Sequence, residues 1–281
     1  MITKMKKQFL KITTLLLGVL CSCSNEHELI PQERAPYLNV SDSLAVVDLW
    51  KKADGPNWLV KWDLKDITTW GGAGIRLDKE KNEYRIVYLN MNGSAESNAK
   101  GYLSESIGDL PELDMFYLAG SGISGQIPQS LSKLEKLRIL VIKGTSIADT
   151  LPKFLFQYPE IEQLEIAGNP LIHGKLPDEI KEIPPKMYLF GLYGNNLSGR
   201  IPDGIKFHGR LILRLDKNSF SEIPFSYCQN TKFRISVKEN KITGVIPDSI
   251  LQNPGSMLQL RSMTYKQKPG YGFENAPDDW K

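Results

Sequence analysis

Residues that commonly carry catalysis are scarce in this chain of 281 residues, which contains three histidines and three cysteines. His27, His173 and His208 lie far apart, and none has a cysteine, histidine or carboxylate at the spacing of a zinc site. The motifs of serine hydrolases, phosphate loops and zinc proteases are also missing. We therefore expect no metal, no cofactor and no enzymatic activity. A glycosidase stays open as an alternative, since its two acids need not be adjacent in sequence.

A strong excess of one charge is missing as well. The chain has 35 basic and 32 acidic residues, a net charge of +3. The first 22 residues hold four lysines and no acid, so the remainder has 31 basic and 32 acidic residues, a net charge of −1. Because nucleic-acid binding depends on a basic surface, this balance argues against a nucleic-acid partner.

Hydrophobic runs are short at the N-terminus. Four lysines precede an apolar run that ends at Leu20, and this run is too short to span a bilayer as a helix. Such a pattern is typical of a secretory signal. We expect residues 1–22 to be a signal peptide and the polar residues 23–40 to be a tether.

The sequence "LCSC" at the end of this run resembles a bacterial lipoprotein signal with Cys23 as the lipidated residue. Cleavage before Cys21 and a plain secretory signal are the alternatives. The following "SNEHE" resembles surface-export signals of lipoproteins from the Bacteroides group. These resemblances imply an extracytoplasmic protein, lipid-anchored to the outer membrane and exposed at the cell surface. Cys228 would then have no disulfide partner, and we expect it to be a small buried apolar residue.

What the sequence does contain is a repeat. "NNLSGRIPDGI" at Asn195 recurs as "SGISGQIPQSL" at Ser121 and "NKITGVIPDSI" at Asn240, with weaker copies between and before them. Each copy follows a short apolar run. These runs start at Ile86, Leu113, Leu137, Ile161, Met187, Arg210 and Lys232, and an eighth, truncated run starts at Gly255. The period of about 24 residues predicts a repeat architecture.

Strand periodicity divides each apolar run into two faces, because alternate side chains of a strand point the same way. The inward residues of the central strands are Phe116, Leu118, Leu140, Ile142, Leu164 and Ile166. One coil cannot bury that face alone, whereas stacked coils bury it against each other.

Three further positions recur among the copies. After the strand stands a polar residue, which is Ser121, Thr145, Asn169, Asn195, Asn218 and Asn240 in turn. We expect its side chain to bond the backbone of its own turn and of the next coil. Glycines suit a backbone bend, and an Ile-Pro or Leu-Pro pair prevents a helix. The glycines are Gly125, Gly199 and Gly244.

The Leu-Ser-Gly-x-Ile-Pro form resembles the plant-type leucine-rich repeat, from roughly Ile86 to Arg261. The resemblance implies an α/β repeat fold, a right-handed solenoid whose short parallel strands form a concave face. We expect an N-terminal helical cap at 41–84, repeats at 85–262 and a C-terminal cap at 263–281. One inserted residue near His173 and one deleted residue near Glu222 should distort the coils locally.

The expected N-terminal cap begins with a helix. Ser41 or Asp42 would cap this helix, and it would end near Gly55. This cap region resembles the caps that precede plant-type repeats, and an array needs a cap because its first coil has an open apolar face. The cap also contains three tryptophans that could pack inside it or form a sugar-stacking platform. These are Trp58, Trp62 and Trp70.

The outward strand residues define the candidate binding surface. Its first half is apolar and aromatic, which suggests a partner, and its second half is basic, which suits an acidic group of a protein or glycan. The candidate residues are Tyr88, Asn90, Met115, Tyr117, Ile139, Val141, Lys143, Glu165, Tyr193, Arg214, Asp216, Arg234, Lys238 and Arg261.

Leucine-rich repeats are scaffolds for protein binding, so the resemblance implies a non-catalytic, monomeric recognition protein that binds a protein ligand on its concave face. The alternative is a glycan-binding surface lipoprotein associated with polysaccharide uptake, which the clusters of Trp and Tyr suggest.

Overall fold

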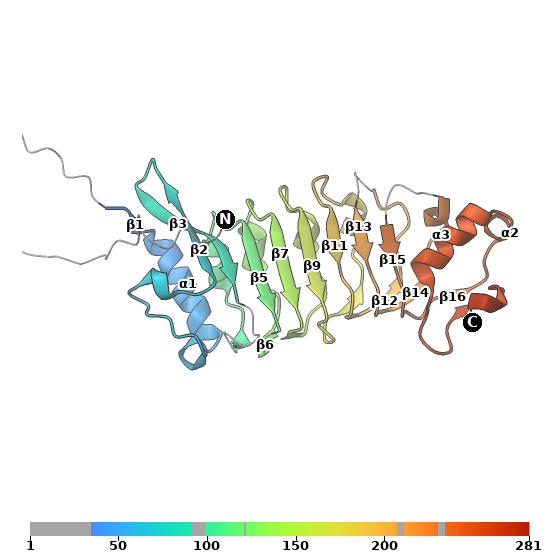
Figure 1. The fold of residues 1–281 in the computed structure, drawn as a ribbon, viewed down its shortest axis with the longest axis horizontal. Helices are drawn as coiled ribbons and strands as arrows, with labels where there is room; N and C mark the ends of the chain where they lie inside the picture. The colour runs from blue at the N-terminus through green and yellow to red at the C-terminus, as the bar shows by residue number, and fades with distance from the viewer. Residues whose placement is uncertain (1–34, 92–98, 121, 207–210, 230–233, 281) are drawn as a thin grey trace, which may run out of the picture.

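The computed structural model describes residues 35–91, 99–120, 122–206, 211–229 and 234–280, which form one elongated solenoid (Figure 1). Short strands lie side by side along it, with a helix at each end. The expected signal peptide, Cys23 and most of the tether lie outside the described residues. Within the described part of the chain, no helix is long and apolar enough to cross a membrane.

One long sheet of nine strands, parallel except for β2, runs along the solenoid and contains the seven strands that the repeat predicts. β1 (Tyr37–Leu38) pairs in parallel with the start of the first repeat strand, and β2 (Ala73–Asp78) pairs antiparallel with the same strand. The seven repeat strands are β3 (Glu83–Asn90), β5 (Met115–Ala119), β7 (Ile139–Lys143), β9 (Gln163–Ala167), β11 (Leu189–Gly191), β13 (Ile212–Arg214) and β15 (Arg234–Ser236).

The inner face of this sheet is the core, which confirms the predicted register. Phe116, Leu140 and Leu164 are in register on β5, β7 and β9 and are fully buried, as are Leu192 and Leu215 in later coils. Each fully buried Leu, Ile or Phe stabilises the fold by about 1.5–3 kcal/mol relative to an exposed one. This stacked apolar ridge therefore supplies much of the driving force for folding.

A ladder of buried asparagines follows the strands. The amide of Asn218 donates to the carbonyl oxygens of Leu192 at 2.8 Å and Leu215 at 3.1 Å, and its Oδ1 accepts from the Leu197 N–H at 3.0 Å. The bond to its own turn was predicted. The second partner is the preceding coil, not the next one, because the amide lies against the Leu192 carbonyl, one residue beyond β11.

The opposite side of each coil consists of short strands and single helical turns. Two three-stranded parallel sheets form there, β4 (Lys100–Tyr102), β6 (Gly122–Gly125) and β8 (Ser146–Ile147), then β10 (His173–Lys175), β12 (Asn196–Arg200) and β14 (Ser219–Glu222). The helical turns are η3 (Glu105–Asp109), η4 (Gln129–Lys133), η5 (Lys153–Phe156), η6 (Asp178–Glu182) and η7 (Phe225–Gln229).

The irregular copies distort this side without breaking the stack. The break between the two small sheets falls at β10, where the inserted residue lies. The pairing of β12 with β14 shifts between Gly199 and Arg200, opposite the deletion. Gly125, Gly199 and Gly244 have φ of 83°, 80° and 119°, so these bends need the left-handed region as predicted.

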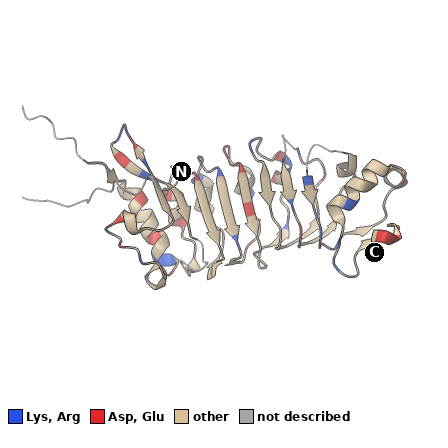
Figure 2. Cartoon of the chain, in the orientation of Figure 1, with Lys and Arg blue, Asp and Glu red and all other residues tan. Residues whose placement is uncertain are grey.

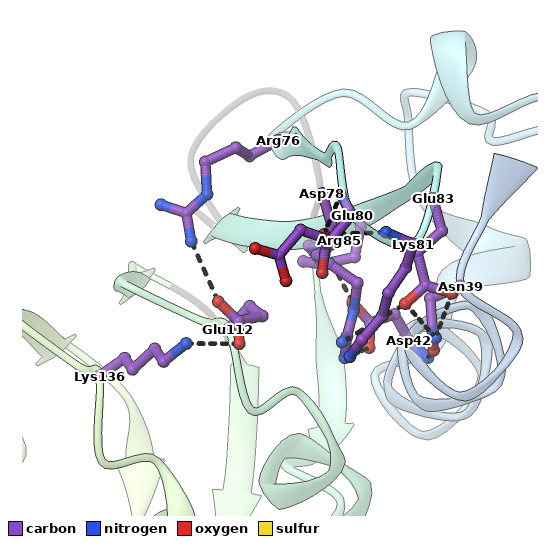
Figure 3. Close-up of polar contacts among 11 residues, drawn as sticks. Asn39, Asp42, Arg76, Asp78, Glu80, Lys81, Glu83, Arg85, Glu112 and Lys136 are labelled. Atoms are coloured by element: carbon purple, nitrogen blue, oxygen red, sulfur yellow. Dashed lines mark hydrogen bonds and ion pairs between the residues drawn. The ribbon is translucent and has the colours of Figure 1, made fainter. Parts of the chain in front are cut away.

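The N-terminal cap contains helix α1 (Val40–Lys52). Its N-cap is Asn39, whose Oδ1 accepts from the Asp42 N–H at 3.1 Å, and so the expectation of Ser41 or Asp42 was wrong. The reason is that the Asp42 carboxylate is used elsewhere. It forms a buried ion pair with Arg85 of β3 at 2.7 Å, which fastens α1 to the first repeat strand (Figure 3).

The three tryptophans pack inside the cap, beside η1 (Gly55–Asn57) and η2 (Ile67–Thr69). Trp58, Trp62 and Trp70 are 2%, 8% and 3% exposed. Trp62 stacks on Trp70 with ring centroids 5.5 Å apart and meets Trp58 edge-on at 5.1 Å. Because their faces are covered, they form a cap core and not a sugar-stacking platform.

The expected eighth strand at Gly255 is instead part of helix α3 (Pro254–Thr264), so that prediction was wrong. Asn253 caps this helix by accepting from the Ser256 N–H at 3.0 Å, and Pro254 in the first turn favours a helix start. The terminal region also contains α2 (Asp248–Leu251), η8 (Asp278–Trp280) and the strand pair β16 (Thr243–Gly244) and β17 (Gly272–Phe273).

Candidate ligand-binding surface

The register of the long sheet arranges its outward side chains in three rows that cross the repeats. The first row is Tyr88, Met115, Ile139, Gln163, Leu189, Ile212 and Arg234. The second row is Asn90, Tyr117, Val141, Glu165, Gly191, Arg214 and Ser236. The third row lies two residues after the second row in each coil, and it includes Lys143, Tyr193, Asp216 and Lys238.

The N-terminal half of this surface is apolar and only partly exposed. The rings of Tyr88 and Tyr117 lie 5.9 Å apart, and burial raises the pKa of the Tyr117 phenol. Val141, which was also predicted as a ligand contact, points outward but is only 5% exposed. It lies in register between Tyr117 and Glu165, whose larger side chains flank it.

The middle of the surface is a set of mutually satisfied polar groups. Glu165 is 7% exposed and accepts from Gln163 at 2.6 Å, from Tyr193 at 3.4 Å and from Lys143 at 3.4 Å. The contact with the Tyr193 phenol, together with the charge of Glu165, raises the pKa of Lys143. Lys143 and Glu165 therefore neutralise each other and support Tyr193, although both were predicted as ligand contacts.

The C-terminal half is a basic hollow of about 670 Å³. It brings together five predicted residues, which are Tyr193, Arg214, Asp216, Arg234 and Lys238. The guanidinium carbon of Arg214 lies 4.1 Å from the centre of the Tyr193 ring, within the range of a cation–π contact. Such an aromatic support restrains the long arginine side chain.

Three cationic side chains of the hollow have no ion-pair partner among the described residues. Within the part of the chain that the structure describes, no carboxylate lies within 4.0 Å of the charged nitrogens of Arg214, Arg234 or Lys238. Asp216 accepts instead from the hydroxyl of Ser236 and from the Lys238 N–H at 3.0 Å. Figure 2 shows that the middles of most strands are uncharged and that charges gather toward their ends. The hollow therefore concentrates free positive charge.

Arg261 does not belong to this surface, although the sequence predicted it there. It lies on α3, where its guanidinium pairs with Asp279 at 2.8 Å and lies 5.5 Å from the centre of the Tyr265 ring. The reason is the helix that replaces the eighth strand.

Sequence reasoning missed Lys217 and Glu239, which line the hollow and form an ion pair at 3.7 Å. Both have positive φ, 56° and 53°, in the turn where earlier coils have Gly144 and Gly168. The sequence did contain a signal for them. A glycine recurs in this turn of the earlier coils, and a charged residue that replaces it adds a side chain to the outward surface of its coil.

Acidic residues on the outer side of the coils are paired with lysines. Asp178, Glu179 and Glu182 each have a lysine nitrogen within 2.9 Å. The pairs of Asp178 and Glu182 are largely exposed, whereas Glu179 is partly buried. Among the described residues, no group of three or more His, Cys, Asp or Glu side chains could hold a metal ion.

Comparisons with solved structures identify the architecture. The fold is a leucine-rich-repeat solenoid. A plant ice-binding protein matches with a TM-score of 0.64 and 24% identity over 74% of this chain. The leucine-rich-repeat ectodomain of the membrane receptor kinase GASSHO1/SCHENGEN3 from Arabidopsis thaliana matches with 0.65 and 20% identity over 83%. A pollen receptor kinase 3 matches with 0.52 and 22% identity over 64%.

This chain in turn covers 66% of the ice-binding protein, 27% of the receptor ectodomain and 85% of the pollen receptor kinase structure. No family model and no curated protein matches the sequence. At these identities the likeness establishes the fold, and function has to be argued from the surface itself.

Proposed function

We propose that this protein is a non-catalytic recognition protein whose concave surface binds an acidic segment of a protein ligand. The observation that carries the proposal is the basic hollow, where Arg214, Arg234 and Lys238 have no carboxylate partner among the described residues. An acidic ligand would supply that missing charge. Arg214 is already supported by Tyr193, so less side-chain freedom is lost on binding.

The adjoining apolar rows favour a peptide over an isolated anion. Leu189 and Ile212 continue the first row from the hollow toward Met115 and Tyr88. A peptide that crosses the strands would place an acidic end over the hollow and apolar side chains over this row. Apolar burial would then contribute affinity, and the cations would contribute orientation and association rate.

A defined test is peptide selection on the folded protein, starting from a random display library without bias in charge. We expect the enriched peptides to carry clustered Asp or Glu. Their affinity, measured by fluorescence anisotropy, should fall about tenfold or more in Arg234→Glu and Lys238→Glu, and it should fall with rising salt because part of the interaction is exposed. Lys100→Glu is the matched control, since Lys100 is an exposed lysine on the opposite side of the coil.

Two results would contradict the proposal. One is enrichment of neutral or basic peptides. The other is equal loss of binding in Lys100→Glu and Arg234→Glu, which would indicate a general charge effect and no defined surface.

We also propose that the protein is a monomer at the outer face of the outer membrane, carried there by a signal peptide at 1–22 and a lipid on Cys23. The supporting observation is the sequence pattern at Leu20 to Cys23. Mass spectrometry of the mature N-terminus tests it directly. Cys23→Ser should abolish lipidation, whereas Cys21→Ser should leave it intact, and the reverse outcome would assign the lipid to Cys21.

A further inference from the structure

A second pocket, of about 310 Å³, lies in the C-terminal cap and shares no residue with the basic hollow. It is formed by the end of α3, the loop that leads to β17, and η8. Tyr265, Tyr271 and Trp280 contribute aromatic walls, and Phe273 and Ala276 add apolar lining.

Side-chain amides fix this pocket to the last coil. Gln267 donates to the Val237 carbonyl at 3.1 Å and accepts from the Ile242 N–H at 3.2 Å. Asn275 both accepts from and donates to the backbone of Ile246, at 2.8 and 2.9 Å. These bonds continue the asparagine ladder in a different form. The walls are therefore held in place before any ligand arrives, which lowers the entropic cost of binding.

The aromatic walls are more exposed than a cap needs. Tyr265 and Tyr271 are 43% and 44% exposed, and Trp280 is partly exposed. Neither tyrosine hydroxyl nor the indole N–H has a hydrogen-bond partner in the described part of the chain. A terminal cap ordinarily presents a polar outer face. Here it presents aromatic rings whose polar ends are available.

Charge restricts what the pocket can bind. Lys266 also lines it, forms no ion pair with any described carboxylate, and shares the lining with no acidic residue. A cationic ligand is thereby disfavoured, and a neutral or anionic one is favoured. Arg261 is not available to an anionic ligand in place of Lys266, because it pairs with Asp279 and contacts the Tyr265 ring from α3.

Exposure restricts the ligand further. A typical pocket buries 70–90% of the surface of a flat apolar ligand. A pocket whose tyrosine walls are this exposed cannot bury so much. A saccharide is better matched, because one face of its ring is apolar while its hydroxyls stay hydrated. We propose that this pocket binds an acidic saccharide, with the ring packed on Tyr271 and Trp280 and the carboxylate paired with Lys266.

The test uses digalacturonic acid as probe and galactobiose as its neutral counterpart, each at millimolar concentration in saturation-transfer NMR and titration. We expect digalacturonic acid to bind, and Tyr271→Ala and Trp280→Ala each to weaken it about tenfold. Lys266→Met should remove the preference for the acidic sugar while leaving the fold unchanged. Tyr37→Ala is the matched control, since Tyr37 is 51% exposed at the opposite end of the solenoid.

Three outcomes would overturn the inference. They are no transfer from either sugar, binding that Trp280→Ala and Lys266→Met leave unchanged, or loss of binding in Arg234→Glu. The last would place the sugar in the basic hollow instead. Peptide binding at the hollow and sugar binding at the cap can thus fail separately.

Discussion

We predict that the buried ion pair between Asp42 and Arg85 holds the N-terminal cap on the repeats. Asp42 is fully buried and Arg85 is 8% exposed. The carboxylate accepts from Arg85 Nη2 at 2.7 Å, from Arg85 Nε at 3.0 Å and from the Ile86 N–H at 2.8 Å. Glu83 lies 3.7 Å from the same guanidinium, and Asn39 donates to both oxygens of Glu83 (Figure 3).

Breaking one side of such a pair is costly because a charge stays buried. Arg85→Met leaves the Asp42 carboxylate with only the Ile86 N–H, and we expect a loss of about 3–5 kcal/mol. Asp42→Asn should cost less, toward 3 kcal/mol, since Glu83 remains near Arg85. The double variant removes both charges. It should be more stable than the sum of the two changes implies, by about 2 kcal/mol.

Tryptophan fluorescence during urea unfolding measures this region selectively. Trp50, Trp58, Trp62 and Trp70 all lie in the cap, so a Trp280→Phe background leaves only cap signals. The four variants are compared as a double-mutant cycle in that background. Asp178 and Lys181 form an exposed pair three residues apart, and the matched cycle on this pair should give no measurable coupling.

Additive effects of Asp42→Asn and Arg85→Met would refute the reasoning. Additivity would mean that the two charges are not in desolvated contact and that α1 is held by apolar packing alone.

Two further predictions concern titratable groups. Hydrogen bonds from Ser104, and then Ser106, lower the pKa of the Asp48 carboxyl. The stabilisation is therefore present above the ordinary pKa and is lost as pH falls through the lower folded value, so Asp48→Asn should flatten the fall in stability below about pH 4; an unchanged pH curve would contradict this. Burial raises the pKa of Cys228 to about 11, so iodoacetamide at pH 8 should label it only after unfolding in a chain with Cys21 and Cys23 replaced by serine. Rapid labelling of the folded chain would be inconsistent with that burial.

The inner ridge and the outward rows could be predicted from the sequence because two periodicities coincide there. Strand alternation assigns a face to each residue, and the repeat of about 24 residues applies that assignment to every coil. Phe116 and Leu164 followed from this pattern alone. The asparagines followed for a similar reason, since a buried amide at a strand end must bond to the backbone.

Accessibility within the rows could not be predicted in the same way, because it depends on neighbouring side chains. Val141 and Glu165 point outward as expected but are 5% and 7% exposed. Gly191 beside Glu165 in the second row leaves space that Glu165 and Tyr193 occupy. An outward position on a strand is therefore only a candidate contact. Arg234 and Lys238 remain available because β15 is the last repeat strand of the sheet.

The end of the array shows why one pattern can support two structures. The run from Gly255 contains alternating apolar residues, as a strand requires, but Ser256, Leu260 and Met263 also follow helical spacing and are buried on α3. A helix is favoured because another open strand would leave its backbone edge and its apolar face uncovered. The Val237 N–H instead donates to the Met263 carbonyl at 2.9 Å, and α3 covers the last coil. Termination of the solenoid thus moves Arg261 away from the concave surface and places it against Tyr265, one wall of the aromatic pocket.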